Sequence, residues 1–198
     1  MTPIAPVIPL LLALALSDGR ELDDVELARR IRGGDRVAFR AFFERYHGIL
    51  YGYLRRRGVG PAVCEDLAQQ AFVKIWERRE DIQPGKSLRA FLFKISYNRA
   101  LNHFRDTAKF TDDAKLHERS SGADPEARAE YALMQEHLYK TVEELPERRR
   151  AVFELCFLED LTYREAAEAL DISVKTVENQ MSSALKVLRA AFEHFNDP

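Results

Sequence analysis

A segment near the C-terminal end carries side chains suited to hydrogen bonding with base pairs. Polar groups recur there on one side of an expected helix, while apolar groups recur on the other. The polar residues are Lys175, Thr176, Glu178, Asn179, Ser182, Lys186 and Arg189. Ammonium, hydroxyl and amide groups are the side chains that contact base edges in the major groove of DNA. The apolar residues, predicted to face inward, are Val174, Val177, Met181, Leu185 and Leu188.

The residues just before this segment would hold it at the surface. Thr162 and Glu165 have the spacing of a capping box, which predicts the start of a short helix rich in alanine. Asp171 stands at a sharp turn, and Ser173 can cap the second helix. An ordinary helical hairpin with a solvated face is the alternative interpretation. The two caps and the small-residue packing of the first helix together favour a helix-turn-helix that binds DNA.

A second group of side chains lies on the expected helix from Ser87 to about Asp106. Apolar stripes alternate there with basic and amide groups, namely Arg89, Lys94, Asn98, Arg99, Asn102, His103 and Arg105. Cations bind phosphates, aromatic faces stack on bases and amides read base edges, so the set suits single-stranded nucleic acid. Periodicity alone favours the simpler interpretation, a structural helix with an aromatic core face and a solvated basic face.

The rest of the chain predicts an all-α protein of two small helical domains joined by a flexible linker. Apolar residues recur at helical spacing and no strand pattern is present. We expect helices ending at Gly33-Gly34, then from Asp35 to about Arg57, about 63–79, 87–106 and about 147–158. The predicted divisions are a lead over 1–21, a first domain over 22–106, a linker over 107–128, a second domain over 129–192 and a tail over 193–198.

The net charge of −2 conceals an asymmetry between the halves. Residues 22–106 hold 17 Lys and Arg against 11 Asp and Glu, a balance of +6. Residues 129–198 hold 8 against 14, a balance of −6. The first half is therefore the stronger candidate for following a phosphate backbone, and the second half would bind DNA through a local patch.

The sequence disfavours a disulfide-bonded, a metal-binding and a membrane protein. Cys64 and Cys156 lie far apart, which fits a reducing, cytoplasmic location and neither a disulfide framework nor a zinc site. The five histidines lack ligand spacing, so we expect no metal and no cofactor. The apolar run over 8–16 has no preceding Lys or Arg and is too short to cross a bilayer, so we expect no membrane contact. The lead is interpreted as disordered or as a misplaced start.

Two sequence blocks resemble the extracytoplasmic-function sigma factors of bacterial RNA polymerase, over about residues 22–192. The segments Glu65–Trp76, Pro84–Leu92 and Ile95–Arg105 resemble the family's second conserved region. The segments Leu145–Arg148 and Leu161–Arg189 resemble its fourth region. Two independent blocks in the right order make the resemblance specific, whereas the helix-turn-helix alone also occurs in response regulators.

The resemblance implies a mechanism in which the first domain binds core polymerase and opens the −10 promoter element, while the second reads the −35 element in the duplex. It assigns core contacts to Asp66, Gln69 and Gln70. It assigns −10 contacts to Gln83, Lys86, Ser87, Arg89, Asn98, Arg99 and Asn102. It assigns −35 contacts to Arg148, Arg149, Arg150, Lys175, Thr176, Glu178, Asn179, Ser182, Ser183 and Lys186. An anti-sigma factor is a further candidate partner.

Two other function classes stay open from the residues themselves. A transcriptional regulator with a sensing or dimerising first half would also use the helix-turn-helix, but it gives no reason for the 65–76 block. An enzyme would need a reaction centre, and the sequence contains neither a glycine-rich phosphate loop nor an HExxH motif. Transcription with purified core polymerase distinguishes a sigma factor from a regulator, because a regulator would require another sigma factor.

Overall fold

The computed structural model describes residues 23–83, 85–108 and 136–192. Within those ranges every regular element is helical, which confirms the all-α prediction. The predicted lead and tail, and nearly all of the predicted linker, lie outside the described residues. Below, the first domain means residues 23–108 and the second domain means residues 136–192.

The first domain is built from four α-helices and one 3-10 turn. They are α2 (Asp24–Arg32), α3 (Arg36–Arg56), α4 (Pro61–Glu77), η1 (Arg79–Asp81) and α5 (Leu88–Ala108). Asp23 caps α2, and Asp35 caps α3 at the predicted start of that helix, because each carboxylate accepts backbone N–H groups of the first turn. Helix α4 begins two residues earlier than predicted, since proline suits the first helical position.

An aromatic core holds these helices together. The Phe42 and Phe72 rings lie 5.6 Å apart edge to face, joining α3 to α4. Tyr53 and Phe93 do the same at 5.2 Å and join α3 to α5. All four side chains are buried, and such pairs add to the free energy gained from burying their area. The helical spacing of the aromatics in the sequence is therefore a core pattern.

The second domain comprises a helical stretch over 136–143 and four further elements. They are α7 (Glu147–Phe153), the π-helical stretch η2 (Glu154–Leu158), α8 (Tyr163–Leu170) and α9 (Val174–Phe192). The single helix predicted over 147–158 thus changes its hydrogen bonding at Glu154. The capping box is present in both directions, with Glu165 N–H donating to Thr162 and Thr162 N–H donating to Glu165.

The turn of the helix-turn-helix forms as predicted, with one error at its end. Asp171 has a φ of 56° in the left-handed region, and Ser173 caps α9 by accepting from Thr176 N–H at 3.0 Å. Val177, Met181 and Leu188 are buried. The prediction that Val174 faces inward is wrong, because this side chain is 42% exposed. It stands at the first position of α9, beyond the part of the helix that packs against the rest of the domain.

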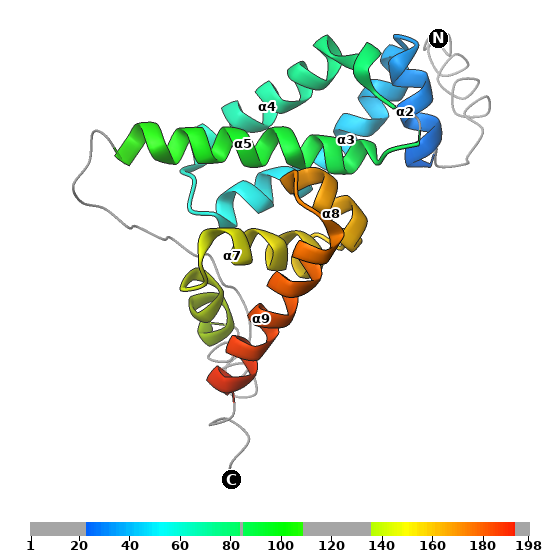
Figure 1. Ribbon diagram of the computed structural model, residues 1–198. Coiled ribbons are helices and arrows are strands. Elements are labelled where there is room, and N and C mark those ends of the chain that lie inside the picture. Colours follow the sequence, from blue (N-terminus) through cyan, green and yellow to red (C-terminus); the bar gives the residue numbers. More distant parts are fainter. Residues whose placement is uncertain (1–22, 84, 109–135, 193–198) are drawn as a thin grey trace, which may run out of the picture.

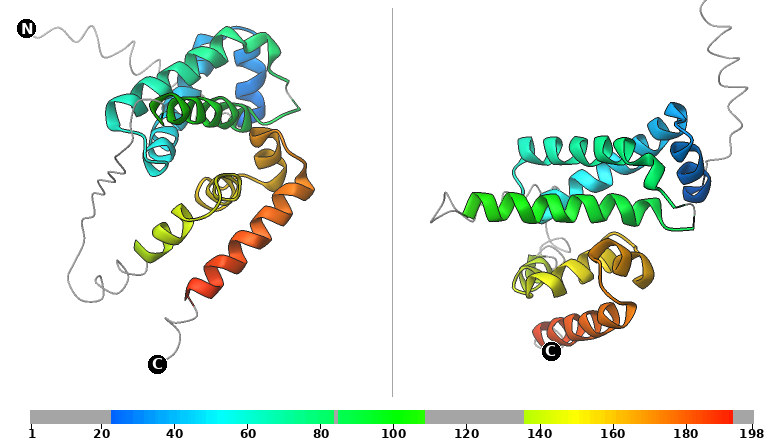
Figure 2. Two further views of the ribbon diagram at one scale, coloured as in Figure 1. Left: turned by 60° about the vertical axis from the view of Figure 1, so that its left-hand side comes forward. Right: turned by 45° about the horizontal axis from the view of Figure 1, so that its top comes forward.

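The two domains pack against each other, and α8 on α5 is the largest contact between them (Figure 1). The two rotated views agree that α8 lies directly beneath α5 (Figure 2). Helix α9 runs away from the first domain and packs on α7 and α8 instead. The first helix of the helix-turn-helix is therefore covered by the first domain, while the second helix is not.

Candidate nucleic-acid interface

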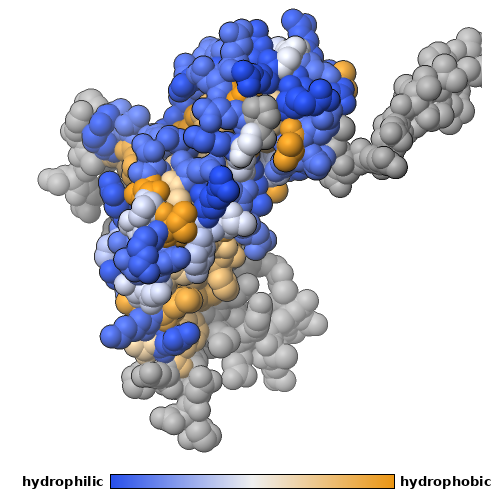
Figure 3. Space-filling view, turned by 45° about the vertical axis from the view of Figure 1, so that its right-hand side comes forward, coloured by the Kyte–Doolittle hydropathy of each residue, from blue (hydrophilic) through white to orange (hydrophobic). Residues whose placement is uncertain are grey.

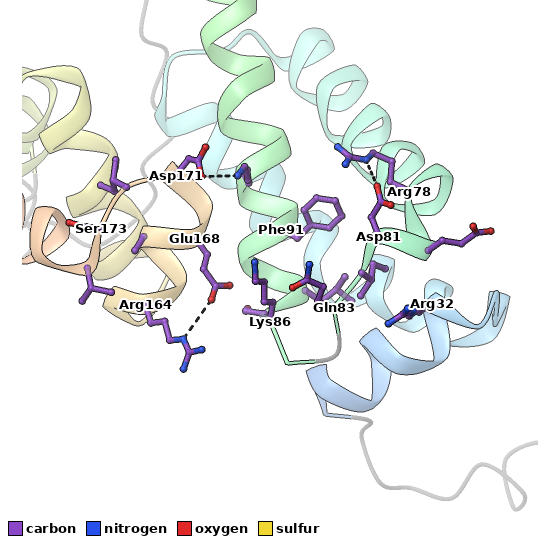
Figure 4. A pocket seen from close by; sticks show the side chains of 18 residues that line it. Arg32, Arg78, Asp81, Gln83, Lys86, Phe91, Arg164, Glu168, Asp171 and Ser173 are labelled. Atoms are coloured by element: carbon purple, nitrogen blue, oxygen red, sulfur yellow. Dashed lines mark hydrogen bonds and ion pairs between the residues drawn. The ribbon is translucent and has the colours of Figure 1, made fainter.

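A cleft opens where the loop before α5 faces the helix-turn-helix (Figure 4). Its volume is about 1030 Å³, which is ample for a nucleobase. Gln83, Lys86 and Phe91 line it from the first domain, and Arg164 and Glu168 line it from the second. Aromatic, amide and cationic groups on one wall suit a base and its phosphate.

The loop that forms this wall is held by short local bonds. Lys86 N–H donates to the Gln83 carbonyl at 2.9 Å, and this closes a turn that leaves both side chains exposed. Ser87 Oγ accepts from Ala90 N–H at 3.1 Å and so caps α5. The same hydroxyl donates to Glu165 Oε1 of the second domain at 2.7 Å. Ser87 is therefore both a cap and a contact between the domains.

The candidate −10 residues on α5 divide into two environments. Asn98 and Asn102 are exposed and free to meet a strand. Arg89 is half-buried, with its guanidinium 6.0 Å from the centre of the Tyr46 ring. Arg99 donates to the side-chain oxygen of Gln70 on α4. The structure thus links a candidate −10 residue to a candidate core-binding residue.

The candidate core-binding residues share one exposed side of α4. Asp66 and Gln69 are exposed, and Gln70 is half-buried beside them. Gln70 donates to Asp66 at 2.6 Å, and Gln69 donates to Glu65 at 2.8 Å. Val73, one turn further on, is 56% exposed. Polar groups flanking an exposed apolar side chain form a surface suited to a protein partner.

The predicted −35 residues on α9 lie along its solvent-facing side. Lys175, Asn179, Ser182 and Lys186 are exposed, and the remaining members, Thr176, Glu178 and Ser183, are partly exposed. Lys175 pairs with Glu178 at 3.0 Å, so its ammonium is held near the start of the helix. In Figure 3 hydrophilic side chains dominate the upper part of the molecule, and hydrophobic ones gather lower down.

The three consecutive arginines of α7 do not form one cluster. Arg148 is exposed, whereas Arg149 and Arg150 are partly buried. Arg150 donates to Glu154 at 2.7 Å and to the Arg56 carbonyl of the first domain at 3.0 Å. In this arrangement Arg150 stabilises the domain contact, and Arg148 is the exposed cation of the three.

A buried ionic network crosses between the domains at the end of α3. Arg57 is only 5% exposed and donates to Glu154 at 2.6 Å and to Glu147. Its guanidinium also lies 5.7 Å and 5.3 Å from the ring centres of Tyr53 and Tyr97. Burial alone would lower the pKa of Arg57, because it disfavours the charged guanidinium. Tyr53, Glu154 and Glu147 together raise that pKa above its usual range.

Two further carboxylates of the second domain respond to the contact in opposite ways. Burial raises the pKa of Glu159, although Arg56 donates to it and opposes that rise. Burial also acts against the Glu165 carboxylate, but bonds from Ser87 and Thr162 lower the pKa of Glu165 below its usual value. Glu165 is thus held ionised at the contact with α5.

Sequence reasoning missed Phe91 and Arg78 in the cleft. The Arg78 guanidinium lies 6.0 Å from the centre of the Phe91 ring, beside the loop that forms the cleft wall. The sequence did carry a signal for Phe91. It stands four residues after the capping Ser87, about one helical turn, so its side chain lies beside the loop before α5. The network of Arg57 had no sequence signal, because its partners lie about ninety residues away.

Comparison with known proteins gives matches on both domains. The family described as Sigma-70 region 2 matches residues 42–110, and Sigma-70, region 4 matches residues 135–188. The chain is 28% identical to the ECF RNA polymerase sigma factor RpoE of Cereibacter sphaeroides, covering 84% of this chain and 93% of the relative. The chain belongs to the extracytoplasmic-function sigma factors. It is an alternative sigma factor, and proteins of this family are not enzymes.

Other relatives extend this result along the chain. RNA polymerase sigma factor NccH of Alcaligenes xylosoxydans is 29% identical to this sigma factor, covering 86% of this chain and 95% of the relative. The solved structure of CnrH with the cytosolic domain of CnrY is similar at a TM-score of 0.64 and 26% identity, covering 86% and 97%. A complex of RpoE with the anti-sigma factor NepR from Bartonella quintana shares the fold at a TM-score of 0.61.

The described ranges contain neither a candidate membrane span nor a cluster of metal-ligating side chains. Across 23–83, 85–108 and 136–192, no helix combines the length and apolar character needed to span a bilayer. Among the same residues, no three His, Cys, Asp or Glu side chains stand close enough to hold a metal ion.

Proposed function

We propose that this sigma factor binds core RNA polymerase through α4 and opens promoters by reading two separated DNA elements with its two domains. The observation that carries this proposal is the pair of distinct polar surfaces, one on α5 with its preceding loop and one on α9, on domains matched by regions 2 and 4. The test is transcription with purified core polymerase. The sigma factor should support initiation without another sigma factor, and failure would favour a regulator.

The core contact is proposed for Asp66, Gln69 and Gln70. Exposure of Asp66 and Gln69 supports it, because these side chains can meet a partner without refolding. Changing Asp66 and Gln69 to Ala should weaken holoenzyme formation and leave the thermal transition nearly unchanged, since exposed substitutions alter stability little. Glu80→Ala, an exposed change outside α4, is the control. Unchanged affinity for core polymerase in a light-scattering titration would remove the assignment.

The −10 element is proposed to bind along the loop from Gln83 to Ser87 and the exposed amides of α5. Extruding a base from the duplex costs on the order of a few kcal/mol, which a shaped site must offset. Phe91 offers a stacking face, while Lys86 and Arg89 supply charge for the phosphates. Asn98, Arg99 and Asn102 continue the surface along α5 and would line the separated strand.

The −35 element is proposed to bind the exposed side of α9, with Arg148 on a phosphate. Polar side chains there can enter the major groove while Val177 and Met181 anchor the helix from behind. Arg148→Ala should weaken binding equally across sequences and reduce the salt slope by about one unit, as expected for one phosphate contact. An anti-sigma factor is proposed as a further partner, because the related RpoE of Bartonella quintana has been solved with one.

A further inference from the structure

Two hydrogen bonds connect α4 to α5 through the side chain of Gln70. Its amide nitrogen donates to Asp66 Oδ2, one turn earlier on α4, at 2.6 Å. Its amide oxygen accepts from Arg99 Nη1 in the middle of α5. Helices α4 and α5 lie along each other, so the bond to Arg99 crosses directly between them (Figure 2). One side chain thus joins a carboxylate of the proposed core contact to a guanidinium of the proposed −10 surface.

The chemistry of the three groups fixes the direction of the amide. A carboxylate only accepts hydrogen bonds and a guanidinium only donates them, whereas an amide does one at each end. Gln70 therefore satisfies both neighbours in one orientation and neither in the other. A carboxylate at this position would repel Asp66, and an aliphatic side chain would bond to neither partner. Each bond has one charged member, and such bonds are shorter and stronger than those between neutral groups.

Burial shields this link at α5 and leaves it accessible at Asp66. Gln70 and Arg99 are half-buried, while Asp66 is exposed. A partner can therefore reach Asp66 without displacing the amide. A guanidinium has several N–H donors, so Arg99 keeps others for a phosphate while one of them is engaged by Gln70.

Gln69 provides a comparison on the same helix. It also donates to a carboxylate one turn earlier, that of Glu65, at 2.8 Å. Gln69 is exposed, and no hydrogen bond among the described residues joins it to α5. The two glutamines therefore match in residue type, helix and kind of partner, and they differ in the link to α5.

We propose that Gln70 is a positioning residue that makes the core contact and the −10 contact strengthen each other. This inference rests on the proposed function, because it assumes that Asp66 meets core polymerase and that Arg99 meets the separated strand. When a polymerase donor fixes Asp66, the two hydrogen bonds also fix Gln70 and the guanidinium of Arg99. The strand then binds a side chain that is already ordered, so the entropy cost of ordering it is not incurred again. By linkage, the strand raises the affinity for core polymerase by the same factor.

The test measures strand binding by the full chain with and without core polymerase at a saturating concentration. The probe is a short fluorescein-labelled DNA single strand that carries the −10 element of a promoter transcribed by the holoenzyme, and its anisotropy reports binding. A strand with the same bases in scrambled order corrects for binding to the polymerase itself. The dissociation constant without core polymerase divided by that with core polymerase is the coupling factor.

Gln70→Leu removes both hydrogen bonds with little change in side-chain size, and Gln69→Leu is the matched variant. Gln70→Leu should lower the coupling factor about fivefold, which is at the low end of typical couplings between sites. Gln69→Leu should leave the coupling factor unchanged, even where it weakens core binding, because its bond does not reach α5. Any other effect of core polymerase on strand affinity is common to the two variants. Equal coupling factors in the two variants would overturn the proposal.

A merely structural role would give a different result. If Gln70 only braced α4 against α5, Gln70→Leu would weaken strand binding equally with and without core polymerase, and the coupling factor would not move. Arg99→Leu supplies a second check, because Gln70 is proposed to act through Arg99. In an Arg99→Leu background, adding Gln70→Leu should not lower the coupling factor further. A further loss would reveal a route that bypasses Arg99 and would overturn the positioning role.

Asn102→Ala separates a failure of this inference from a failure of the proposed function. Asn102 is exposed on the same helix and takes no part in the link. If Asn102→Ala weakens strand binding by the holoenzyme while Gln70→Leu keeps the coupling factor of the unaltered chain, α5 stands as the −10 surface and the coupling through Gln70 is wrong. If neither Asn102→Ala nor Arg99→Leu weakens strand binding, the −10 assignment itself fails, and the coupling is withdrawn with it.

Discussion

Helices α5 and α9 are similar in length, with 21 and 19 residues, and both carry candidate DNA contacts. They are nevertheless placed very differently. Helix α5 packs on α3 and α4 within its own domain and receives α8 from the other domain. Helix α9 packs on α7 and α8 and runs away from the first domain (Figure 1). Its polar side chains Lys175, Asn179, Ser182 and Lys186 are exposed.

This difference shows that exposure on a helix and availability for DNA are separate properties. Asn179 on α9 can meet a duplex in the arrangement described here. Ser87 and Arg89 at the start of α5 are engaged or half-buried, whereas Asn98 and Asn102 in its middle are exposed. The following predictions test how strictly the two helices differ, beginning with the largest effect.

The contrast depends on the buried network that joins the end of α3 to α7 and η2 across the domain contact, so removing the buried partner of Arg57 should have the largest effect. Glu154→Ala leaves Arg57 buried without its main partner and should lower the free energy of unfolding by about 3–5 kcal/mol. Urea denaturation of the full chain measures this. Glu144→Ala is the control and should change stability by less than about 0.5 kcal/mol. A loss for Glu154→Ala no larger than the control's would show that the network does not hold the domains.

The exposed side of α9 should act in duplex recognition independently of α5. Asn179→Ala should relax base preference at one −35 position by about 1–3 kcal/mol, because one amide contact is lost. Binding of holoenzyme to a panel of −35 variants measures the change. Asn102→Ala on α5 should leave that preference intact and slow promoter opening instead. An equal loss on every −35 variant would make Asn179 a nonspecific contact.

Protonation of Glu159, buried at the contact between the domains, should change the stability of the chain without involving α9. The pKa of Glu159 is raised from its ordinary value of 4.5, so the folded chain holds this proton to higher pH than the unfolded chain does. Stability therefore falls as pH rises from about 4.5 through the folded pKa. Glu159→Gln should flatten that slope in denaturation midpoints measured across the range. Glu144→Gln should retain it, and an unchanged slope in Glu159→Gln would show that Glu159 titrates normally.

The smallest effect is expected at the exposed edge of the domain contact. The Lys94 and Asp171 side chains are 37% and 86% exposed, so water and salt weaken their attraction. Lys94→Gln should lower stability by less than about 1 kcal/mol, as is typical of surface pairs. Thermal melts at low and high salt measure it. A loss as large as that of Glu154→Ala would mean that the edge, and not the buried centre, holds the domains together.

Local signals in the sequence were sufficient for most helices and for the helix-turn-helix. Asp35, Ser87, Thr162 and Ser173 cap helices at the predicted starts, because a cap needs only backbone groups two or three residues away. The boundaries that differ from the prediction lie at Pro61, because proline favours the first helical turn, and at Glu154, where the hydrogen bonding becomes π-helical.

The exposure of candidate residues was also predictable where it follows from helical periodicity. Asn98, Asn102, Asn179 and Lys186 lie on the solvent side as their spacing requires. Val174 is exposed although it belongs to the apolar stripe of α9, because the end of a helix can extend beyond the surface that would cover it. The roles of these residues in binding stay predictions.

The sequence by itself determined which segments are helical, where most of them begin and which family the chain resembles, since these depend on neighbours within a few residues. Only the tertiary structure decided that α8 lies on α5, that Arg57 is buried with Glu154 and that Ser87 meets Glu165. Those partners are separated by 97 and 78 positions. No local pattern specifies such a pairing, because charges at that separation meet only after both domains have folded and buried their apolar faces.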